Sequence, residues 1–228
     1  MLFRSHPLRP HRLSPVRVAV LVSGSGTNLQ ALLDALGPAG PARVVRVLSS
    51  RPDAGALQRA RDAGVPTTVL SDARDAAELL TALGDADLAV LAGYLQRIPP
   101  AAVARFRQRL INIHPALLPA FGGPGMYGRR VHEAVLASGA PISGATVHYV
   151  DDQYDRGPII AQWPVPVRAG DTPESLAARV LEVEHRLLPR VVLELARRGL
   201  PGAPVRLFAV GSTFVAGGDI AIDFADGG

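Results

Sequence analysis

Short apolar runs alternate along this chain with longer segments whose apolar residues recur at helical spacing. The runs VRVAVLV, RVVRVLSS and DLAVLAG are rich in valine and leucine, whereas NLQALLDAL and DARDAAELLTAL repeat leucine and alanine with a period near 3.6. Strands that are apolar on both faces and alternate with helices indicate a parallel sheet covered on both sides. We therefore predict an α/β fold with a doubly wound, mostly parallel sheet, a Rossmann-like arrangement.

The pattern changes after residue 115. A glycine-rich loop, AFGGPGMYGRR, precedes a short helix near VHEAVLAS, and the runs SGATVHYV and PIIAQWPVPV predict a hairpin. A long helix is expected from about Asp171, because Thr172 and Ser175 suit a helix start, and Pro189 is expected to bend it. We expect one domain over residues 16–200, a disordered basic extension over 1–15, and a tail over 201–228 that packs on the domain or is partly disordered.

Composition excludes several chemistries. The chain has no cysteine, and all of its 24 basic residues are arginine, so thiolate nucleophiles, Schiff bases and a Walker lysine are absent. Four arginines and no acid lie in residues 1–17, which leaves a neutral body and argues against a nucleic-acid partner. No apolar run approaches the ~20 residues of a membrane span. We expect a cytoplasmic protein, monomer or homodimer, that acts on small molecules.

The loop SGSGTN follows the first strand and opens a helix. Main-chain N–H groups and small polar side chains at a helix N-terminus suit a phosphate; the residues concerned are Gly24, Ser25, Gly26, Thr27 and Asn28. A simple tight turn with Thr27 or Asn28 as helix cap is the alternative. The dinucleotide-binding fingerprint needs a third glycine at the position of Leu29, so this loop does not match it. The segment SSRPD after the second strand could mimic an NADP-binding site, so an NADP reductase remains a weak alternative.

The stretch INIHPALLP places two polar residues at the end of an apolar strand. Alternate strand residues face the same way, so Asn112 and His114 should project together at the carboxyl edge of the sheet. Two donors converging there would stabilise a developing oxyanion, and Asp155 in DDQYDRGP is the best candidate to orient the histidine. Asp151 and Asp152 remain open as competitors, and so does a merely structural His114.

The other histidines of the body are not expected to bind a metal. His132, His148 and His185 show no metal-ligand spacing, so no metal is expected, and His148 lies within an alternating strand that makes it structural. A serine hydrolase is disfavoured because the chain has no Gly-x-Ser-x-Gly elbow.

Taken in order, the segments VLVSGSGTNLQALLDA, LAGYLQRIPP, RLINIHPALLPAF, SGATVHYVDDQYDRGPIIAQWPVPV and DTPESLAARVLEVEHRLLP resemble the folate-dependent formyltransferase superfamily. The resemblance covers roughly residues 16–200, and the Ser-Gly-x-Gly-Thr-Asn loop points to the branch that acts on glycinamide ribonucleotide. It implies a Rossmann-like fold and transfer of a formyl group from 10-formyltetrahydrofolate, the co-substrate, to the amine of 5′-phosphoribosylglycinamide in purine biosynthesis.

The resemblance also implies roles for individual residues. The substrate phosphate would lie on the glycine loop, and Glu184 near the ribose or glycinamide. Asn112 and a protonated His114 would hold the oxyanion, while Asp155 keeps His114 charged and relays the amine's proton through water. The folate would contact Tyr94, Leu95, Gln96, Arg97, Ile98, Leu110 and Val150.

Some positions depart from the family pattern. LQRI shifts the expected arginine by one place to Arg97, Leu181 replaces a polar residue of relatives, and the FGGPGMYGRR loop is long. A formyltetrahydrofolate deformylase or another formyltransferase of the superfamily is the alternative function. The deformylase carries an N-terminal regulatory domain that residues 1–15 could not form, and methionyl-tRNA formyltransferase carries a C-terminal RNA-binding domain. A non-enzymatic nucleotide-binding module would leave Asn112, His114 and Asp155 idle.

Overall fold

The computed structural model describes residues 14–200, 207–210, 213–216 and 220–223. Most of the basic extension expected over 1–15, and parts of the tail expected over 201–228, lie outside the described residues. The strands are β1 (Val16–Val22), β2 (Ala42–Ser49), β3 (Thr67–Val69), β4 (Leu88–Leu91), β5 (Leu110–His114), β6 (Ile142–Tyr149), β7 (Ile159–Pro166), β8 (Leu207–Val210), β9 (Thr213–Ala216) and β10 (Ile220–Asp223). The helices are α1 (Thr27–Ala35), α2 (Ala56–Asp62), α3 (Ala76–Leu83), α4 (Pro100–Arg105), α5 (Arg129–Ala137) and α6 (Pro173–Arg198).

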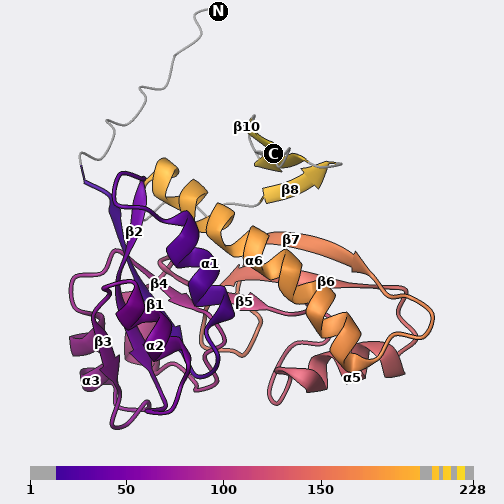
Figure 1. Cartoon of the computed structure of the whole chain (residues 1–228), viewed down its shortest axis with the longest axis horizontal. Coiled ribbons are helices and arrows are strands. Elements are labelled where there is room, and N and C mark those ends of the chain that lie inside the picture. The colour runs from indigo at the N-terminus through magenta and orange to yellow at the C-terminus, as the bar shows by residue number, and fades with distance from the viewer. Residues whose placement is uncertain (1–13, 201–206, 211–212, 217–219, 224–228) are drawn as a thin grey trace, which may run out of the picture.

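One sheet runs through the described part of the chain in the order β10-β9-β8-β7-β6-β5-β4-β1-β2-β3 (Figure 1). The five strands from β3 to β5 are parallel, which confirms the predicted doubly wound arrangement. The expected hairpin is formed by β6 and β7, which pair antiparallel. β6 also pairs antiparallel with β5 on its other side. The strand order reverses between β1 and β4, the place where such sheets open a crevice for ligands.

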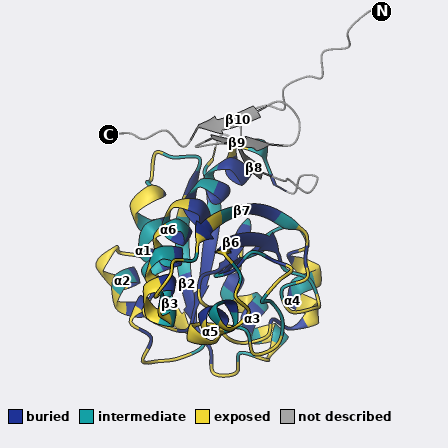
Figure 2. Cartoon of the chain, turned by 90° about the vertical axis from the view of Figure 1, so that its right-hand side faces the viewer, coloured by how far each residue is buried: buried dark blue, intermediate teal, exposed yellow. Residues whose placement is uncertain are grey.

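Helices cover both faces of the sheet. In β1, Val18 and Val20 pack with the cluster that holds Leu29 of α1 and Leu187 of α6, whereas Leu21 packs with the cluster that holds Leu79 of α3. Side chains of β1 pack against helices on both faces of the sheet, which explains why the strand is apolar at successive positions. The dark blue strands between the partly exposed helices of Figure 2 show the same layering. Of the helices in the described residues, none is long and apolar enough to cross a membrane.

The long helix α6 begins as predicted. Thr172 caps it by accepting a hydrogen bond from the Ser175 amide, and the Ser175 hydroxyl accepts one from the Thr172 amide. Pro189 lies inside the helix, which continues to Arg198 and ends before Gly199. The helix crosses the face of the sheet next to α1 and α5, so its first half reaches the carboxyl ends of the parallel strands (Figure 1).

Candidate active site

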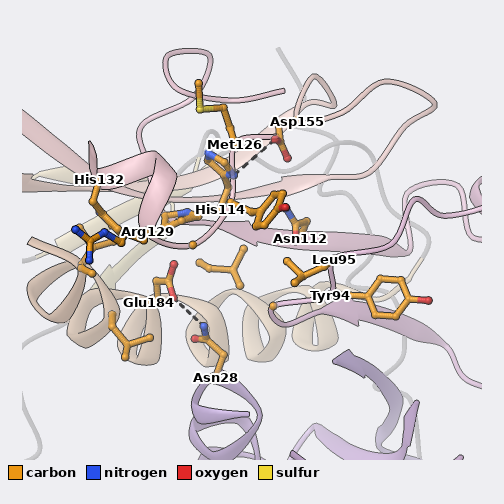
Figure 3. Close-up of a pocket in the computed structure, with 18 of the residues that line it drawn as sticks. Asn28, Tyr94, Leu95, Asn112, His114, Met126, Arg129, His132, Asp155 and Glu184 are labelled. Carbon is orange, nitrogen blue, oxygen red and sulfur yellow. Dashed lines mark hydrogen bonds and ion pairs between the residues drawn. The ribbon is translucent and has the colours of Figure 1, made fainter. Parts of the chain in front are cut away.

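A cavity of about 650 Å³ opens beyond the carboxyl ends of β1, β4 and β5. This volume suits a small-molecule ligand, for which pockets typically measure about 300–1,000 Å³. Its walls come from the glycine loop, the loop after β4, the end of β5, α5 with the loop before it, and the first half of α6 (Figure 3). Segments far apart in the sequence therefore meet beyond β1 and β4, where the strand order reverses, as the fold predicts.

The glycine loop shapes one wall of this cavity. Gly26 has a left-handed φ of 77°, and a Cβ there would lie 2.5 Å from the Cβ of Ala56, so only glycine fits. Gly26 is also the cap residue of α1, and no side chain caps the helix, so neither Thr27 nor Asn28 is the cap. Ser25, Thr27 and Asn28 line the cavity, whereas Gly24 and Gly26 shape the turn without lining it.

Asn28 joins the glycine loop to the long helix. Its Nδ2 donates a hydrogen bond of 2.8 Å to Oε2 of Glu184, and its Oδ1 is buried without a partner. Burial raises the pKa of Glu184 to about 7, an effect that the Asn28 hydrogen bond only partly offsets. Both side chains line the cavity, and Leu181 lies beside them. The pair thus links the glycine loop to α6 in the wall of the cavity.

Asn112 and His114 both line the cavity, as their alternation along β5 predicts. Residues of the antiparallel neighbour β6 face them across the ladder: Asn112 is opposite His148, and His114 is opposite Thr146. Nδ1 of His148 donates to the Tyr149 carbonyl at 2.9 Å, because a carbonyl only accepts. In the neutral ring Nε2 then accepts from Nδ2 of Asn112 at 3.1 Å, which leaves the second Asn112 N–H for a ligand.

Asp155 is the carboxylate next to His114. Its Oδ2 lies 3.7 Å from His114 Nδ1 and accepts a 2.9 Å hydrogen bond from the Gly123 amide, while Oδ1 lies 3.6 Å from His148 Nε2. Burial alone would raise the pKa of Asp155, but His148 and His114 in their charged forms, together with the Gly123 amide, bring it below its ordinary value. Asp155 has a positive φ of 55°, a conformation that aspartate tolerates better than most residues.

The glycine-rich loop explains how Asp155 is held. A Cβ on Gly122 would lie 3.1 Å from the Cβ of Asp155, so glycine lets the two segments approach closely. The sequence left Asp151 and Asp152 as competitors. Both line a neighbouring cavity of about 90 Å³ that Asp155 shares, and neither lines the cavity that contains His114.

His114 is 3% exposed and faces two acceptors. Its Nε2 donates to the Phe121 carbonyl at 2.9 Å, and Nδ1 faces Asp155. Burial lowers the pKa of His114 below its ordinary value; Asp155 and the Phe121 carbonyl act against this effect, and His148 adds to it. Both ring nitrogens of His114 therefore point at protein acceptors, whereas Asn112 keeps one N–H for a ligand.

The residues expected to contact folate divide into three groups. Tyr94, Leu95 and Gln96 line the main cavity, and the neighbouring 90 Å³ cavity is lined by Arg97, Ile98 and Val150 among others. The Arg97 guanidinium donates to the Asp152 carbonyl at 3.0 Å and so holds the loop that carries Asp155. Leu110 is 2% exposed, packs in the core cluster under α3 and α4, and lines neither cavity.

Sequence reasoning missed two histidines at the site. His148, expected to be structural, contacts Asn112 and lies beside Asp155, a placement that the antiparallel register of β5 and β6 produces. His132 of α5 lines the main cavity together with Arg129. Within the described residues, no group of three histidine, aspartate or glutamate side chains is arranged to hold a metal ion.

Comparisons with known proteins found a matching family and several relatives. A model of the formyl transferase family matches residues 16–192. Phosphoribosylglycinamide formyltransferase of Mycobacterium tuberculosis is 45% identical over 202 residues, covering 85% of this chain and 91% of that protein. The chloroplastic enzyme of that name from Vigna unguiculata is 44% identical over 185 residues, covering 77% of this chain but 59% of the plant protein. The chain thus spans about six tenths of the length of the plant relatives it matches.

Solved structures give the same result. The crystal structure of phosphoribosylglycinamide formyltransferase from Anaplasma phagocytophilum superposes with a TM-score of 0.74 at 39% identity, covering 80% of this chain and 88% of that one. Glycinamide ribonucleotide transformylase 1 from Symbiobacterium toebii superposes with a TM-score of 0.73, also at 39% identity, covering 91% of this chain and 95% of that one.

Proposed function

The chain belongs to the formyl transferase family, and from this membership and its cavity we propose that it transfers a formyl group from 10-formyltetrahydrofolate to the amine of 5′-phosphoribosylglycinamide. The products are formyl-phosphoribosylglycinamide and tetrahydrofolate, and the reaction is a step of purine biosynthesis. One observation carries the proposal: Asn112, His114 and Asp155 meet at the cavity of a chain 45% identical to a relative that bears this activity in its name.

The ribonucleotide binds between the glycine loop and α6. The main-chain N–H groups at the start of α1 receive the phosphate, because no side chain caps this helix end and its dipole favours an anion. Asn28 and Glu184 meet the ribose or glycinamide, since both residues line the cavity beside the glycine loop. Leu181 adds an apolar contact at a position where relatives carry a polar side chain.

The folate co-substrate binds across the two adjoining cavities. Tyr94, Gln96, Asn112, Tyr154 and Asp155 line both of them, so one ligand can extend from the catalytic residues into the smaller cavity. Leu110 supports this region from the core, because it pairs with β4 next to the Tyr94–Ile98 loop.

Formyl transfer proceeds by attack of the amine nitrogen on the formyl carbon. The formyl oxygen gains negative charge, and the free N–H of Asn112 donates to it. This new charge raises the pKa of His114, so Nδ1 of the ring binds a proton from solvent water, and the imidazolium stabilises the transition state more than the ground state. Asp155 holds the ring in place and favours its charged form.

The test mixes purified protein with 10-formyltetrahydrofolate and follows folate absorbance with and without the ribonucleotide. We expect tetrahydrofolate only when the ribonucleotide is present, and a large loss of kcat in Asp155→Asn. Asp62→Asn, which changes an exposed carboxylate on α2, serves as the control. Release without the ribonucleotide would instead identify a formyltetrahydrofolate deformylase, and release under neither condition would contradict the proposal.

A further inference from the structure

Two consecutive peptide groups of the glycine loop are held from one side by α2. The Ala56 amide at the start of that helix donates to the Gly24 carbonyl at 3.1 Å, and Nε of Arg59 donates to the Ser25 carbonyl at 2.9 Å. Helix α2 packs against α1 here (Figure 1), and a Cβ on Gly26 would collide with Ala56. Donors of one helix therefore occupy two successive carbonyl oxygens of the loop.

The N–H groups of the same two peptide groups are open to a ligand. The oxygen of Gly24 and the N–H of Ser25 belong to one peptide group, and the oxygen of Ser25 and the N–H of Gly26 belong to the next. Because C=O and N–H point in opposite directions across a trans peptide bond, both N–H groups point away from α2. Neither has a hydrogen-bond partner among the described residues, and Ser25 lines the cavity. These two N–H groups can therefore bind an anion.

Arg59 adds a full positive charge to this arrangement. Its Nη1 donates to Oε1 of Gln30 at 3.3 Å, and Nε2 of Gln30 donates to Asp34 on the same helix. The guanidinium is thereby fixed between the glycine loop and α1. A charged donor on the Ser25 oxygen polarises the whole peptide group, so the N–H of Gly26 becomes a stronger donor.

The surroundings of Arg59 also favour an anion. Arg59 lines a groove between α1 and α6, and Thr27 lines both this groove and the main cavity. Burial, and then the charge of Arg59, lower the pKa of His185, so the field of Arg59 reaches α6. A surplus of positive charge attracts phosphate-bearing ligands. The ionisable side chains that line the groove are Asp34, Arg59, His185, Arg186 and Arg190.

We propose that Arg59 is a positioning residue for the substrate phosphate: through the Ser25 carbonyl it orients and polarises the N–H groups that bind this phosphate. The inference rests on the proposed function, in which the phosphate of 5′-phosphoribosylglycinamide lies on the glycine loop. Arg59 does not line the main cavity, so it acts on the ligand through the loop and not by contact. Its loss weakens binding of the phosphorylated substrate and leaves the chemistry at the end of β5 unchanged.

The experiment compares Arg59→Leu and Arg59→Lys with the wild type on two substrates, 5′-phosphoribosylglycinamide and the same nucleoside without its phosphate. A hydrogen bond that involves a charged group typically changes an equilibrium constant about tenfold or more. We expect Arg59→Leu to lower kcat/KM for the phosphorylated substrate about tenfold, through KM, and to leave kcat/KM for the nucleoside unchanged. Arg59→Lys keeps a charged donor and should retain most of the wild-type value. Calorimetry measures binding of the ribonucleotide to each protein without any need for turnover.

Arg61→Leu is the matched control, because Arg61 is an exposed arginine of the same helix and its guanidinium donates to Gln58 of that helix. This variant should behave as the wild type does. Thermal unfolding checks that each variant is folded, and Arg59→Ala takes the place of Arg59→Leu if the leucine variant does not fold.

Three results would overturn the role of Arg59: unchanged ribonucleotide affinity in its folded leucine variant, an equal loss for both substrates, or an equal loss in Arg61→Leu. A wild type that binds the ribonucleotide without transferring a formyl group would instead contradict the proposed function, and calorimetry would still decide the role of Arg59. A wild type that does not bind the ribonucleotide would overturn both.

Discussion

Glu184 makes the stability of the protein depend on pH in a way that one substitution can remove. Burial raises its pKa from 4.5 to about 7, although Asn28 donates a hydrogen bond to it. Its folded-state pKa lies above the unfolded value, so between these two values the folded state binds more protons than the unfolded state. Glu184 therefore destabilises the fold increasingly as pH rises from 4.5 to 7. The full effect, present above pH 7, is about 3 kcal/mol.

Glu184→Gln removes the charge and keeps an oxygen that can accept from Asn28. We expect the variant to be more stable than the wild type at pH 8, by up to about 3 kcal/mol, and nearly equal to it at pH 4. Urea unfolding followed by the fluorescence of Trp163, the one tryptophan of the chain, measures both free energies. Glu182→Gln, which changes an exposed carboxylate on the same helix, is the matched control. A variant less stable than the wild type at pH 8, or an equal difference at both pH values, would refute the reasoning.

Three further predictions concern the oxyanion donor, a crowded glycine and a helix cap. Asn112→Ala removes the free N–H and should lower kcat about a hundredfold to a thousandfold with an unchanged thermal midpoint, measured in the formyl-transfer assay and by calorimetry. Gly157→Ala would place a Cβ 1.8 Å from the Tyr149 carbonyl oxygen, so we expect a loss of about 3 kcal/mol or more in urea unfolding. Thr172→Ala removes the cap of α6 and should cost about 1 kcal/mol in the same measurement, whereas Thr172→Ser should restore most of it.

The sequence by itself determined the fold class and the main catalytic candidates. Apolar strands of β-branched residues can be buried on both faces only in a covered parallel sheet, so the doubly wound fold follows from local pattern. Alternation along β5 brings Asn112 and His114 to one side, because the period of a strand is two. The cap of α6 at Thr172 is likewise a local signal, since the capping box depends on residues three positions apart.

Only the tertiary structure decided which carboxylate stands beside His114 and which other histidines reach the cavity. Asp155, rather than Asp151 or Asp152, faces His114 because the turn after β6 packs against Gly122 and Gly123, a contact between segments more than thirty residues apart. His148 contacts Asn112 through the register of two antiparallel strands, which local sequence does not specify. His132 carries no motif, and it comes to line the cavity only because α5 packs against α6.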